Sequence, residues 1–222
     1  MTDAHCHVTG GDPAVREFLI GRDFVGVHPW EGLGGLESLG GLEGWLRDKL
    51  KNTNLLPGVG EIGLDRLRAR GIPPQMRAVF ETQLKLALEF RRPVVLHGAK
   101  CWGQVVKTVQ TFQTSQTSQT FLFHGFSRSD GLIPDIVALG GYISVGPAVL
   151  NDHAVNYREL VKKIPHDRLL LETDRTAENA AGCPSVRDVA AEVAKLLRMP
   201  LAELESLTDR NAEAFICYNI QK

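Results

Sequence analysis

The chain has 222 residues, of which 43% are hydrophobic and 23% charged, values that are ordinary for a globular protein. Its formal net charge of −1 excludes a global basic field that attracts nucleic acid or an anionic membrane, although a small site could still bind one or two phosphates. No apolar run approaches the roughly 20 residues that cross a bilayer, no signal peptide precedes the first predicted strand, and the four cysteines form no C-x-x-C pair, so we expect a cytoplasmic protein with free thiols and no membrane partner.

The first eight residues contain two histidines at a spacing typical of a strand. In Thr2-Asp3-Ala4-His5-Cys6-His7, a period of two places His5 and His7 on one face and Cys6 on the other. Two imidazoles side by side on a rigid strand form half of a metal site. The alternative, which stays open at this point, is an unrelated pair of histidines near a frayed terminus.

The next segment predicts a helix, a strand and a loop. Residues 12–19 predict a short helix that is capped at its first residue and has a buried stripe of Val15, Phe18 and Leu19. Residues 23–30 predict a second strand with His28 at its end. Residues 31–44 are glycine-rich and should form a loop or lid over the same end of the sheet, leading into a helix at about 43–51.

Residues 56–65 combine a short apolar strand with a carboxylate among glycines. An apolar run of this length, bounded by Pro and Gly, is typical of a buried parallel strand. Glycines on both sides of Glu61 let the backbone come close to whatever the carboxylate binds. A carboxylate at a buried strand end is costly without a strong partner, so we expect Glu61 to bind a metal or another cation.

Strands and helices alternate over the rest of the chain. We predict strands at 93–97, 121–124, 141–145 and 168–174, and helices from 73 or 74 to 91, from 102 to 109, from 129 or 130, over 152–164 and from 184 to the end. The polar run 113–119 should form an exposed connection. This alternation, without a break in composition, favours a single α/β domain over residues 1–222 with a parallel sheet.

Polar side chains recur at the carboxyl ends of the predicted strands. Besides Glu61 and the pair His5 and His7, these are His97, His124 and Asp174. A (β/α) barrel has its active site at this face, whereas a doubly wound open sheet gathers its site near one switch point. We therefore predict a TIM-like (β/α) barrel with all six side chains on one face.

These six side chains are neutral imidazoles and carboxylates, a set that suits Zn, Mn or Mg. Six groups are too many for one zinc ion, which takes about four ligands. They fit two divalent metal ions about 3.5–4 Å apart that share a bridging carboxylate. Glu61 is the natural bridge.

Six short motifs follow one another along the chain: His5-Cys6-His7, Gly26-Val27-His28-Pro29, Gly60-Glu61-Ile62-Gly63-Leu64-Asp65, Val94-Val95-Leu96-His97, His124-Gly125-Phe126-Ser127 and Leu171-Glu172-Thr173-Asp174. In this order they resemble the TatD-type metal-dependent nucleases, a family of amidohydrolase-like barrels. The resemblance spans nearly the whole chain, and its most specific parts are the third and the last motif.

The resemblance implies a role for each ligand. One metal would be held by His5, His7, Glu61 and Asp174, and the other by Glu61, His97 and His124. Metal-activated water would attack a DNA phosphodiester, in a reaction that trims the 3′ ends of single strands. Glu61 and Asp174 would be the catalytic residues, with Asp174 as the general base.

Two further carboxylates are expected behind the ligands. Glu172 and Asp65 would support the ligand imidazoles without touching a metal. For Glu172 an equally open alternative is a polar residue of the barrel interior that a neighbour satisfies.

The substrate contacts depart from the family pattern. Where the family usually has a second histidine after His-Pro, this chain has Trp30, and where it usually has an arginine, this chain has Ala99 followed by Lys100. Both family residues help to grip phosphate. Trp30 could stack on a base or cover the site, and Lys100 could supply a point charge but no bidentate fork. The expected substrate contacts are His28, Trp30, Lys100, Arg128 and Arg175.

The segment between Val8 and Phe24 has room for a helix but not for the extra strand and helix of relatives, so we predict a seven-stranded or distorted barrel that has lost one βα unit. Three functions stay open: a deoxyribonuclease, a metal-dependent hydrolase of a small anionic amide, ester or lactone, and a non-catalytic metal-binding protein. The complete ligand set favours an enzyme, and the basic residues after the strand ends favour an anionic substrate. We expect a monomer.

Overall fold

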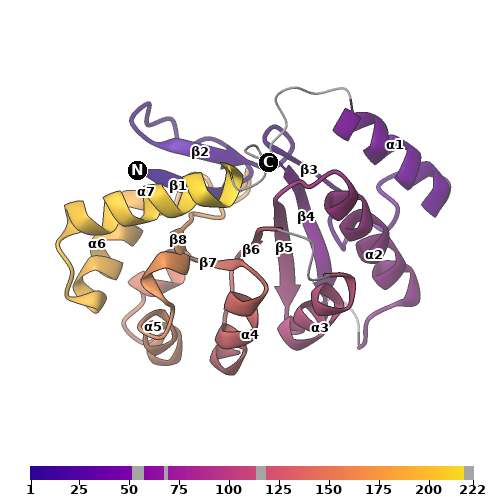
Figure 1. Cartoon of the computed structure of the whole chain (residues 1–222). Helices are drawn as coiled ribbons and strands as arrows, with labels where there is room; N and C mark the ends of the chain where they lie inside the picture. The colour runs from indigo at the N-terminus through magenta and orange to yellow at the C-terminus, as the bar shows by residue number, and fades with distance from the viewer. Residues whose placement is uncertain (52–57, 68–69, 114–118, 218–222) are drawn as a thin grey trace.

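The computed structural model describes residues 1–51, 58–67, 70–113 and 119–217 (Figure 1). Two residues of the predicted strand 56–65, Leu56 and Pro57, lie outside the described residues, as do residues 114–118 of the polar run. Gln119, the last residue of that run, is buried, so the expectation of exposure is wrong at this position.

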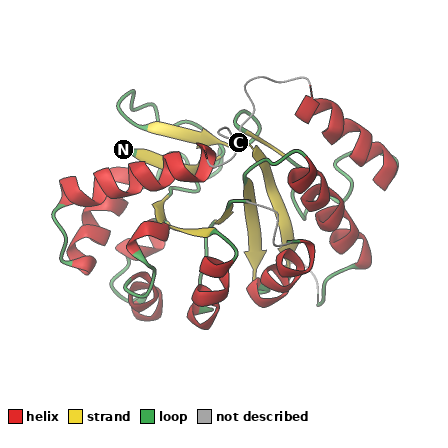
Figure 2. Ribbon diagram, in the orientation of Figure 1, coloured by secondary structure: helices red, strands yellow, loops and turns green. Residues whose placement is uncertain are grey.

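The described strands are β1 (Thr2–Cys6), β2 (Arg16–Leu19), β3 (Phe24–Val25), β4 (Gly58–Asp65), β5 (Val94–Ala99), β6 (Phe121–Phe123), β7 (Gly141–Val145) and β8 (Leu169–Leu171). The described α-helices are α1 (Leu39–Lys51), α2 (Pro74–Glu89), α3 (Trp102–Phe112), α4 (Ile133–Ala138), α5 (Val155–Val161), α6 (Val186–Leu197) and α7 (Leu201–Cys217). Short 3₁₀ turns cover Asp130–Leu132, Pro147–Leu150 and His166–Arg168. The helices surround the strands as an outer layer (Figure 2).

All described strand pairs are parallel, and they form a two-stranded sheet β1-β2 and a six-stranded sheet β3-β4-β5-β6-β7-β8. Two narrow seams join the sheets. An isolated bridge pairs Ile20 with Phe24, and beyond β8 the Asp174 N–H donates to the His5 carbonyl at 3.0 Å. The strands therefore follow one another around an incompletely closed (β/α) barrel, which is the distorted form of the predicted fold.

The predicted helix over 12–19 is wrong, because its second half forms strand β2. Asp12 accepts a hydrogen bond from Ala14 N at 2.9 Å, but this bond closes a turn and starts no helix. Phe18 is buried in the barrel, and Arg16 and Glu17 pair with β1. Pairing with an otherwise open strand edge outweighs the weak helix signal of so short a segment. The described part of the chain therefore has eight strands, and helices rather than a strand are missing before β3.

Other predicted elements are present with different bounds. The strand over 23–30 shortens to β3, helix α1 begins at Leu39 rather than near 43, and the helix over 152–164 shortens to α5. The C-terminal helical region consists of two helices, α6 and α7. They separate at Arg198, whose φ of 53° is left-handed, shortly before Pro200.

The barrel interior is built in layers that follow the period of two. Buried apolar side chains of β5, β6, β7 and β8 form a lower layer with Phe24: they are Val95, Leu122, Tyr142 and Leu170. Helix α7 closes this end, and its Phe215 ring stacks on Phe24 with centroids 5.9 Å apart. Two residues further along the same four strands come His97, His124, Ser144 and Glu172. The polar site therefore lies directly above a packed apolar layer.

Helices α2 and α3 pack on the outside of β4 and β5 through the predicted stripes, which confirms this part of the reading. Asn211 of α7 donates to the carbonyls of His166 and Leu169 at 2.8 Å each, so the C-terminal motif packs against the barrel as expected. Within the described ranges, no helix has both the length and the apolar character that crossing a bilayer requires.

Candidate metal centre

Glu61 reaches the barrel interior because glycines bring its strand close to β5. A Cβ atom at Gly63 would lie 2.0 Å from the His97 carbonyl oxygen, and the φ of Gly63 is +150°. A Cβ atom at Gly60 would lie 2.7 Å from Cβ of Val95. Only glycine fits both demands at position 63. Glu61 itself is only 3% exposed, which confirms that it is a buried carboxylate.

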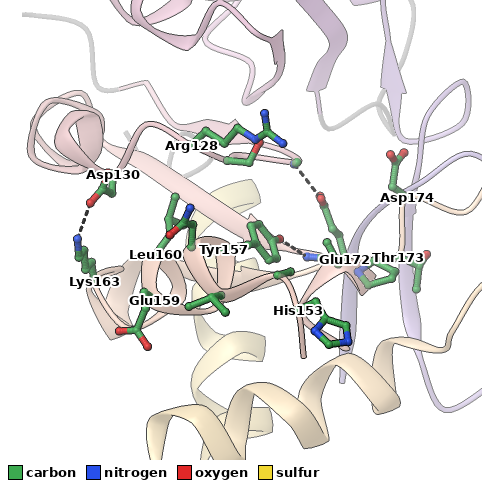
Figure 3. Close-up of a pocket in the computed structure, with 18 of the residues that line it drawn as sticks. Arg128, Asp130, His153, Tyr157, Glu159, Leu160, Lys163, Glu172, Thr173 and Asp174 are labelled. Atoms are coloured by element: carbon green, nitrogen blue, oxygen red, sulfur yellow. Dashed lines mark hydrogen bonds and ion pairs between the residues drawn. The ribbon is translucent and has the colours of Figure 1, made fainter. Parts of the chain in front are cut away.

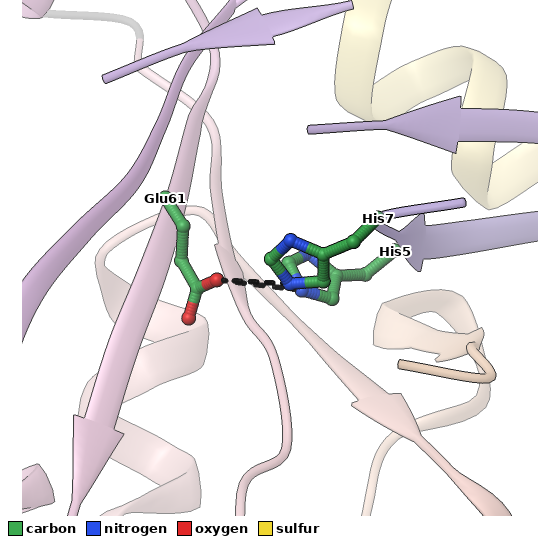
Figure 4. Close-up of side chains that lie close together, drawn as sticks. All are labelled: His5, His7 and Glu61. Carbon is green, nitrogen blue, oxygen red and sulfur yellow. Dashed lines mark ion pairs between the residues drawn. The ribbon is translucent and has the colours of Figure 1, made fainter. Parts of the chain in front are cut away.

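On one side of Glu61, four donor atoms surround a common point. His5 Nε2 lies 3.6 Å from Glu61 Oε2 and 3.5 Å from Asp174 Oδ1. His7 Nε2 lies 3.5 Å and 3.6 Å from the same two oxygens (Figure 4). Ligand atoms about 2.0–2.2 Å from a tetrahedral ion lie about 3.4 Å from one another. These separations are too long for hydrogen bonds and have the size that a shared ion requires.

His5 supports this interpretation through its burial. The side chain is fully buried, and neither ring nitrogen has a hydrogen-bond partner among the described residues. Buried polar atoms are normally satisfied, so an unpaired pair of imidazole nitrogens needs an explanation. A metal ion between His5, His7 and the two carboxylates explains the Nε2 atom. The donor set therefore fits a divalent ion.

On the other side of Glu61, the second carboxylate oxygen faces a different group of histidines. Oε1 lies 2.6 Å from His97 Nδ1 and 2.6 Å from His124 Nε2. His28 Nε2 lies 3.5 Å from the same oxygen. Among the described residues, three groups could hold a metal ion: His5, His7 and Glu61; His5, His124 and Asp174; and His28, Glu61 and His97. The structure brings together all six predicted ligands and adds His28.

Asp65 and Glu172 lie behind two of these imidazoles. Asp65 Oδ2 is 2.7 Å from His97 Nε2, the ring nitrogen that faces away from Glu61. Glu172 Oε2 is 3.9 Å from His124 Nδ1, too long for a direct bond. Glu172 instead accepts hydrogen bonds from Ser144 Oγ at 2.6 Å and Gly125 N at 2.8 Å. Asp65 thus orients a ligand ring directly, whereas Glu172 is held by neighbours of the interior.

Asp174 is placed by a contact that the sequence analysis missed. Its φ of 48° is left-handed, which is uncommon for a residue with a side chain. The neighbouring Thr173 donates through its N–H to Asp3 Oδ1 at 3.0 Å and through its hydroxyl to Asp3 Oδ2 at 2.6 Å. Asp3 therefore fixes the turn that carries Asp174. Period two along β1 puts Asp3 on the face of His5 and His7, and this signal could have identified it.

The electrostatics of the cluster favour a positive charge at its centre. Burial disfavours the charged form of Glu61, but His124 and the other histidines outweigh it and hold its pKa well below the usual range. Burial also opposes the charge on His124, yet Glu61, Glu172 and Asp174 raise its pKa to about 10. His5, by contrast, has its pKa lowered to about 4, mainly by burial. The buried carboxylates thus demand a cation, which a divalent ion supplies as well as a proton.

His28 and Trp30 form the rim of the cluster beside β3. His28 Nδ1 accepts a hydrogen bond from Trp30 N at 3.2 Å, so the proton of the neutral ring lies on Nε2, which faces Glu61. The ring centroids of His28 and Trp30 are 4.8 Å apart, and Trp30 is 43% exposed. Burial raises the pKa of Asp65, but hydrogen bonds from His97 and, to a smaller extent, from Leu67 N and the Trp30 side chain hold it below its usual value. Trp30 therefore both supports Asp65 and presents an aromatic face at the rim.

A buried glutamine that the sequence analysis overlooked holds this rim in place. Gln83 of α2 is fully buried, accepts from Val27 N at 2.7 Å and donates to the Val27 carbonyl at 3.0 Å. These two bonds fix the backbone directly before His28. The signal in the sequence was the place of this glutamine among the apolar positions of α2, which face the core.

The three predicted basic contacts lie in different settings. Lys100 is exposed, with a left-handed φ of 57°. Arg128 is exposed and lines a cavity next to Asp174. Arg175 donates to the carbonyls of Ala180 and Cys183 at 3.3 Å each, so its guanidinium holds its own loop. The structure gives Arg175 this structural role, which the sequence analysis did not predict.

The barrel and the cluster together define a class of protein, the metal-dependent hydrolases whose ligands lie at the carboxyl ends of parallel strands. The family model of the TatD-related DNases matches residues 21–216. The chain therefore belongs to the TatD-related DNase family, which confirms the resemblance.

Individual relatives agree with this assignment. The chain is 28% identical over 182 residues to the uncharacterized metal-dependent hydrolase YabD of Bacillus subtilis, covering 79% of this chain and 70% of that protein. It is 31% identical over 152 residues to the 3′-5′ ssDNA/RNA exonuclease TatD of Edwardsiella piscicida, covering 68% of this chain but 56% of that protein. The crystal structure of YjjV, a TatD homologue from Escherichia coli K12, matches with a TM-score of 0.73 at 26% identity, covering 93% of this chain and 78% of that chain.

Proposed function

We propose that the protein is a phosphodiesterase with two divalent metal ions, Zn, Mg or Mn, that trims the 3′ ends of single-stranded DNA. The observation that carries the proposal is the division of the Glu61 carboxylate. Its Oε2 faces His5 and His7, whereas its Oε1 faces His97 and His124. A carboxylate shared in this way is the bridge that a two-metal site requires.

The ligand roles follow from this division. The first ion would be held by His5, His7, Glu61 and Asp174, and the second by Glu61, His97 and His124. Two bound ions activate a water molecule and neutralise the charge that develops on the phosphate oxygens. Asp65 keeps the His97 ring turned so that Nδ1 faces the bridge.

Side chains of the protein would accept the proton of the attacking water and orient the phosphate. The Asp174 side chain is 49% exposed, in contrast to Glu61 at 3%, so it is the ligand carboxylate that a water molecule can reach. Asp174 is therefore the proposed general base, which accepts the proton of the attacking water. His28 presents an Nε2–H to the centre, and we assign it the orientation of a phosphate oxygen.

The substrate assignment rests on the family and on the rim. The Edwardsiella relative is named as an exonuclease of single-stranded DNA and RNA. The exposed Trp30 face beside the cluster suits stacking on an unpaired base, a contact that is tolerant of sequence. A small anionic amide, ester or lactone is the second candidate. The observation in its favour is that Arg175 is occupied by its own loop, which leaves fewer groups to grip phosphate.

Hydrolysis of a 3′-labelled single-stranded oligonucleotide, with Mg, Mn or Zn added in turn, tests the proposal. We expect early release of the labelled nucleotide and slow shortening of a 5′-labelled copy, with all cleavage lost in Glu61→Gln. Release first from the 5′ end contradicts the polarity. Absence of cleavage with every metal, in protein that binds two ions, rejects the nuclease and favours the small anionic substrate.

A further inference from the structure

A cavity of about 1080 Å³ extends from the metal centre over the loops that follow β6, β7 and β8. Its inner end is formed by Glu172, Thr173 and Asp174, and its outer end by the ion pair between Asp130 and Lys163 (Figure 3). The upper range for pockets of small ligands is about 1,000 Å³. The cavity therefore offers far more room than one scissile phosphate requires.

Among the described residues that line the cavity, the charges leave one cation free to bind an anion. Lys163 pairs with Asp130, and Glu159 pairs with Lys162 at 2.6 Å, so these charges compensate one another. Arg128 lines the cavity, is exposed and has no ion-pair partner within the described residues. Figure 3 shows Arg128 between the Asp130–Lys163 pair and Asp174. A planar guanidinium in this position suits a bidentate contact to phosphate.

Other parts of the cavity lining offer contacts of another kind. It contains the start of α5, where Val155 is 59% exposed and Asn156 is also exposed, together with Pro147 and Ala148. Apolar surface beside an amide matches a nucleoside, which has apolar faces and hydrogen-bonding edges. Arg128 thus suits a phosphate, and the lining at the start of α5 suits a sugar and base.

We propose that this cavity binds the nucleotide next to the scissile one, with Arg128 contacting its phosphate. The inference rests on the proposed function, since the reacting phosphate must lie beside Asp174, at the inner end of the cavity. It implies that the protein prefers chains with at least two phosphodiesters. Compounds with a single phosphodiester reach the metal centre but not Arg128.

The variant Arg128→Gln tests this role, and Arg198→Gln is its matched control. Both arginines are exposed and left-handed, with φ of 57° and 53°, and Arg198 ends α6, outside the cavity. The readouts are kcat/KM for a single-stranded oligonucleotide and for bis(4-nitrophenyl) phosphate, which has one phosphodiester. We expect Arg128→Gln to lower the preference for the oligonucleotide about tenfold, as for one lost charged hydrogen-bond contact. Arg198→Gln should keep the preference of the unmodified protein.

A binding measurement separates this inference from the proposed function. Fluorescence anisotropy of a labelled single-stranded oligonucleotide should show about tenfold weaker binding to Arg128→Gln. The slope of log K against log salt should fall by about 0.7, the value for one phosphate of a single strand. Equal affinity and slope in both arginine variants overturn the inference, as does an equal loss on both substrates. If the protein binds the oligonucleotide as expected but never cleaves it, the proposed function fails and the binding site stands.

Discussion

The two sides of Glu61 use the same kinds of ligand in different geometries. On the side of β1, the nitrogens of His5 and His7 lie 3.5–3.6 Å from two carboxylate oxygens, the spacing of donors around one ion. On the side of β5 and β6, His97 and His124 lie 2.6 Å from Glu61, the distance of charge-assisted hydrogen bonds. The first side is arranged for an ion, whereas the second must first exchange two hydrogen bonds for ligand bonds.

This difference has a structural cause. His5 is fully buried on strand β1, and Asp174 is held by the contact of Thr173 with Asp3. His97 lies within β5 and His124 directly follows β6, and both rings turn toward Glu61 Oε1, with Asp65 behind His97. One bridging carboxylate can therefore join a prearranged metal site to an adjustable one. We expect the first side to bind its ion more tightly.

Removing the bridge should have the largest effect, because it breaks both sides at once. Glu61→Gln should lose both ions and lower activity by about 10⁴-fold, since several kcal/mol of transition-state stabilisation depend on them at about 1.4 kcal/mol per factor of ten. Metal analysis of the dialysed protein checks the stoichiometry. Glu31→Gln, which changes an exposed carboxylate of the loop between β3 and α1, is the control and should keep both ions. Two ions per chain in Glu61→Gln would disprove the bridge.

Removing one histidine should release the ion on one side of Glu61 and leave the ligands of the other side in place. His5→Asn should lose the ion of the first side, and His97→Asn that of the second, each with a loss of activity of about 10³-fold. Because the first side is prearranged, His97→Asn should keep one ion through dialysis, whereas His5→Asn should keep less than one. The expected order is read from metal content after identical dialysis. The reverse order contradicts the comparison between the two sides.

The sequence predicted the metal ligands better than the residues that hold those ligands in place. His97, His124 and Asp174 each end an apolar run, and period two carries that pattern directly onto one barrel face. The segment around Phe18 was wrong as a helix, because a strand of four residues is decided by the neighbour with which it pairs. No local pattern reports such a partner.

The supporting residues show the same limit. Asp3 shares a strand face with His5, so the period of two could have identified it. Gln83 contacts Val27 across 56 residues of sequence, and a glutamine within a helix is most often exposed. Arg175 follows a strand end like a substrate contact but binds its own loop. The partners of Gln83 and Arg175 appear only when the fold is known.

Removing the carboxylates that hold the ligands in place should have smaller effects, each limited to the ion on one side of Glu61. Asp3→Ala releases the turn of Asp174 and should weaken the ion of the first side by about 10–100-fold, whereas Asp65→Ala should do the same to the second side. Competition with a chelator of known affinity measures the affinity of each side for its ion separately. Thermal unfolding of both variants in the absence of metal verifies that they fold. If either variant weakened the binding of both ions equally, Asp3 and Asp65 would not each act on one side alone.

The smallest effect on the metals is expected from Gln83, which acts on the rim alone. Gln83→Leu leaves the Val27 N–H and carbonyl buried without partners, at about 1–3 kcal/mol each, so the melting temperature should fall by roughly 4–24 °C. Because Val27 directly precedes His28, activity should fall less than about tenfold while both ions remain bound. Gln75→Leu changes an exposed glutamine of the same helix and should leave the melting temperature within about 2 °C, as is usual for a surface substitution. If the two variants have the same melting temperature, the hydrogen bonds of Gln83 to Val27 do not hold the rim. If Gln83→Leu loses an ion, His28 belongs to the ligands of the second side and not to the groups that orient the substrate.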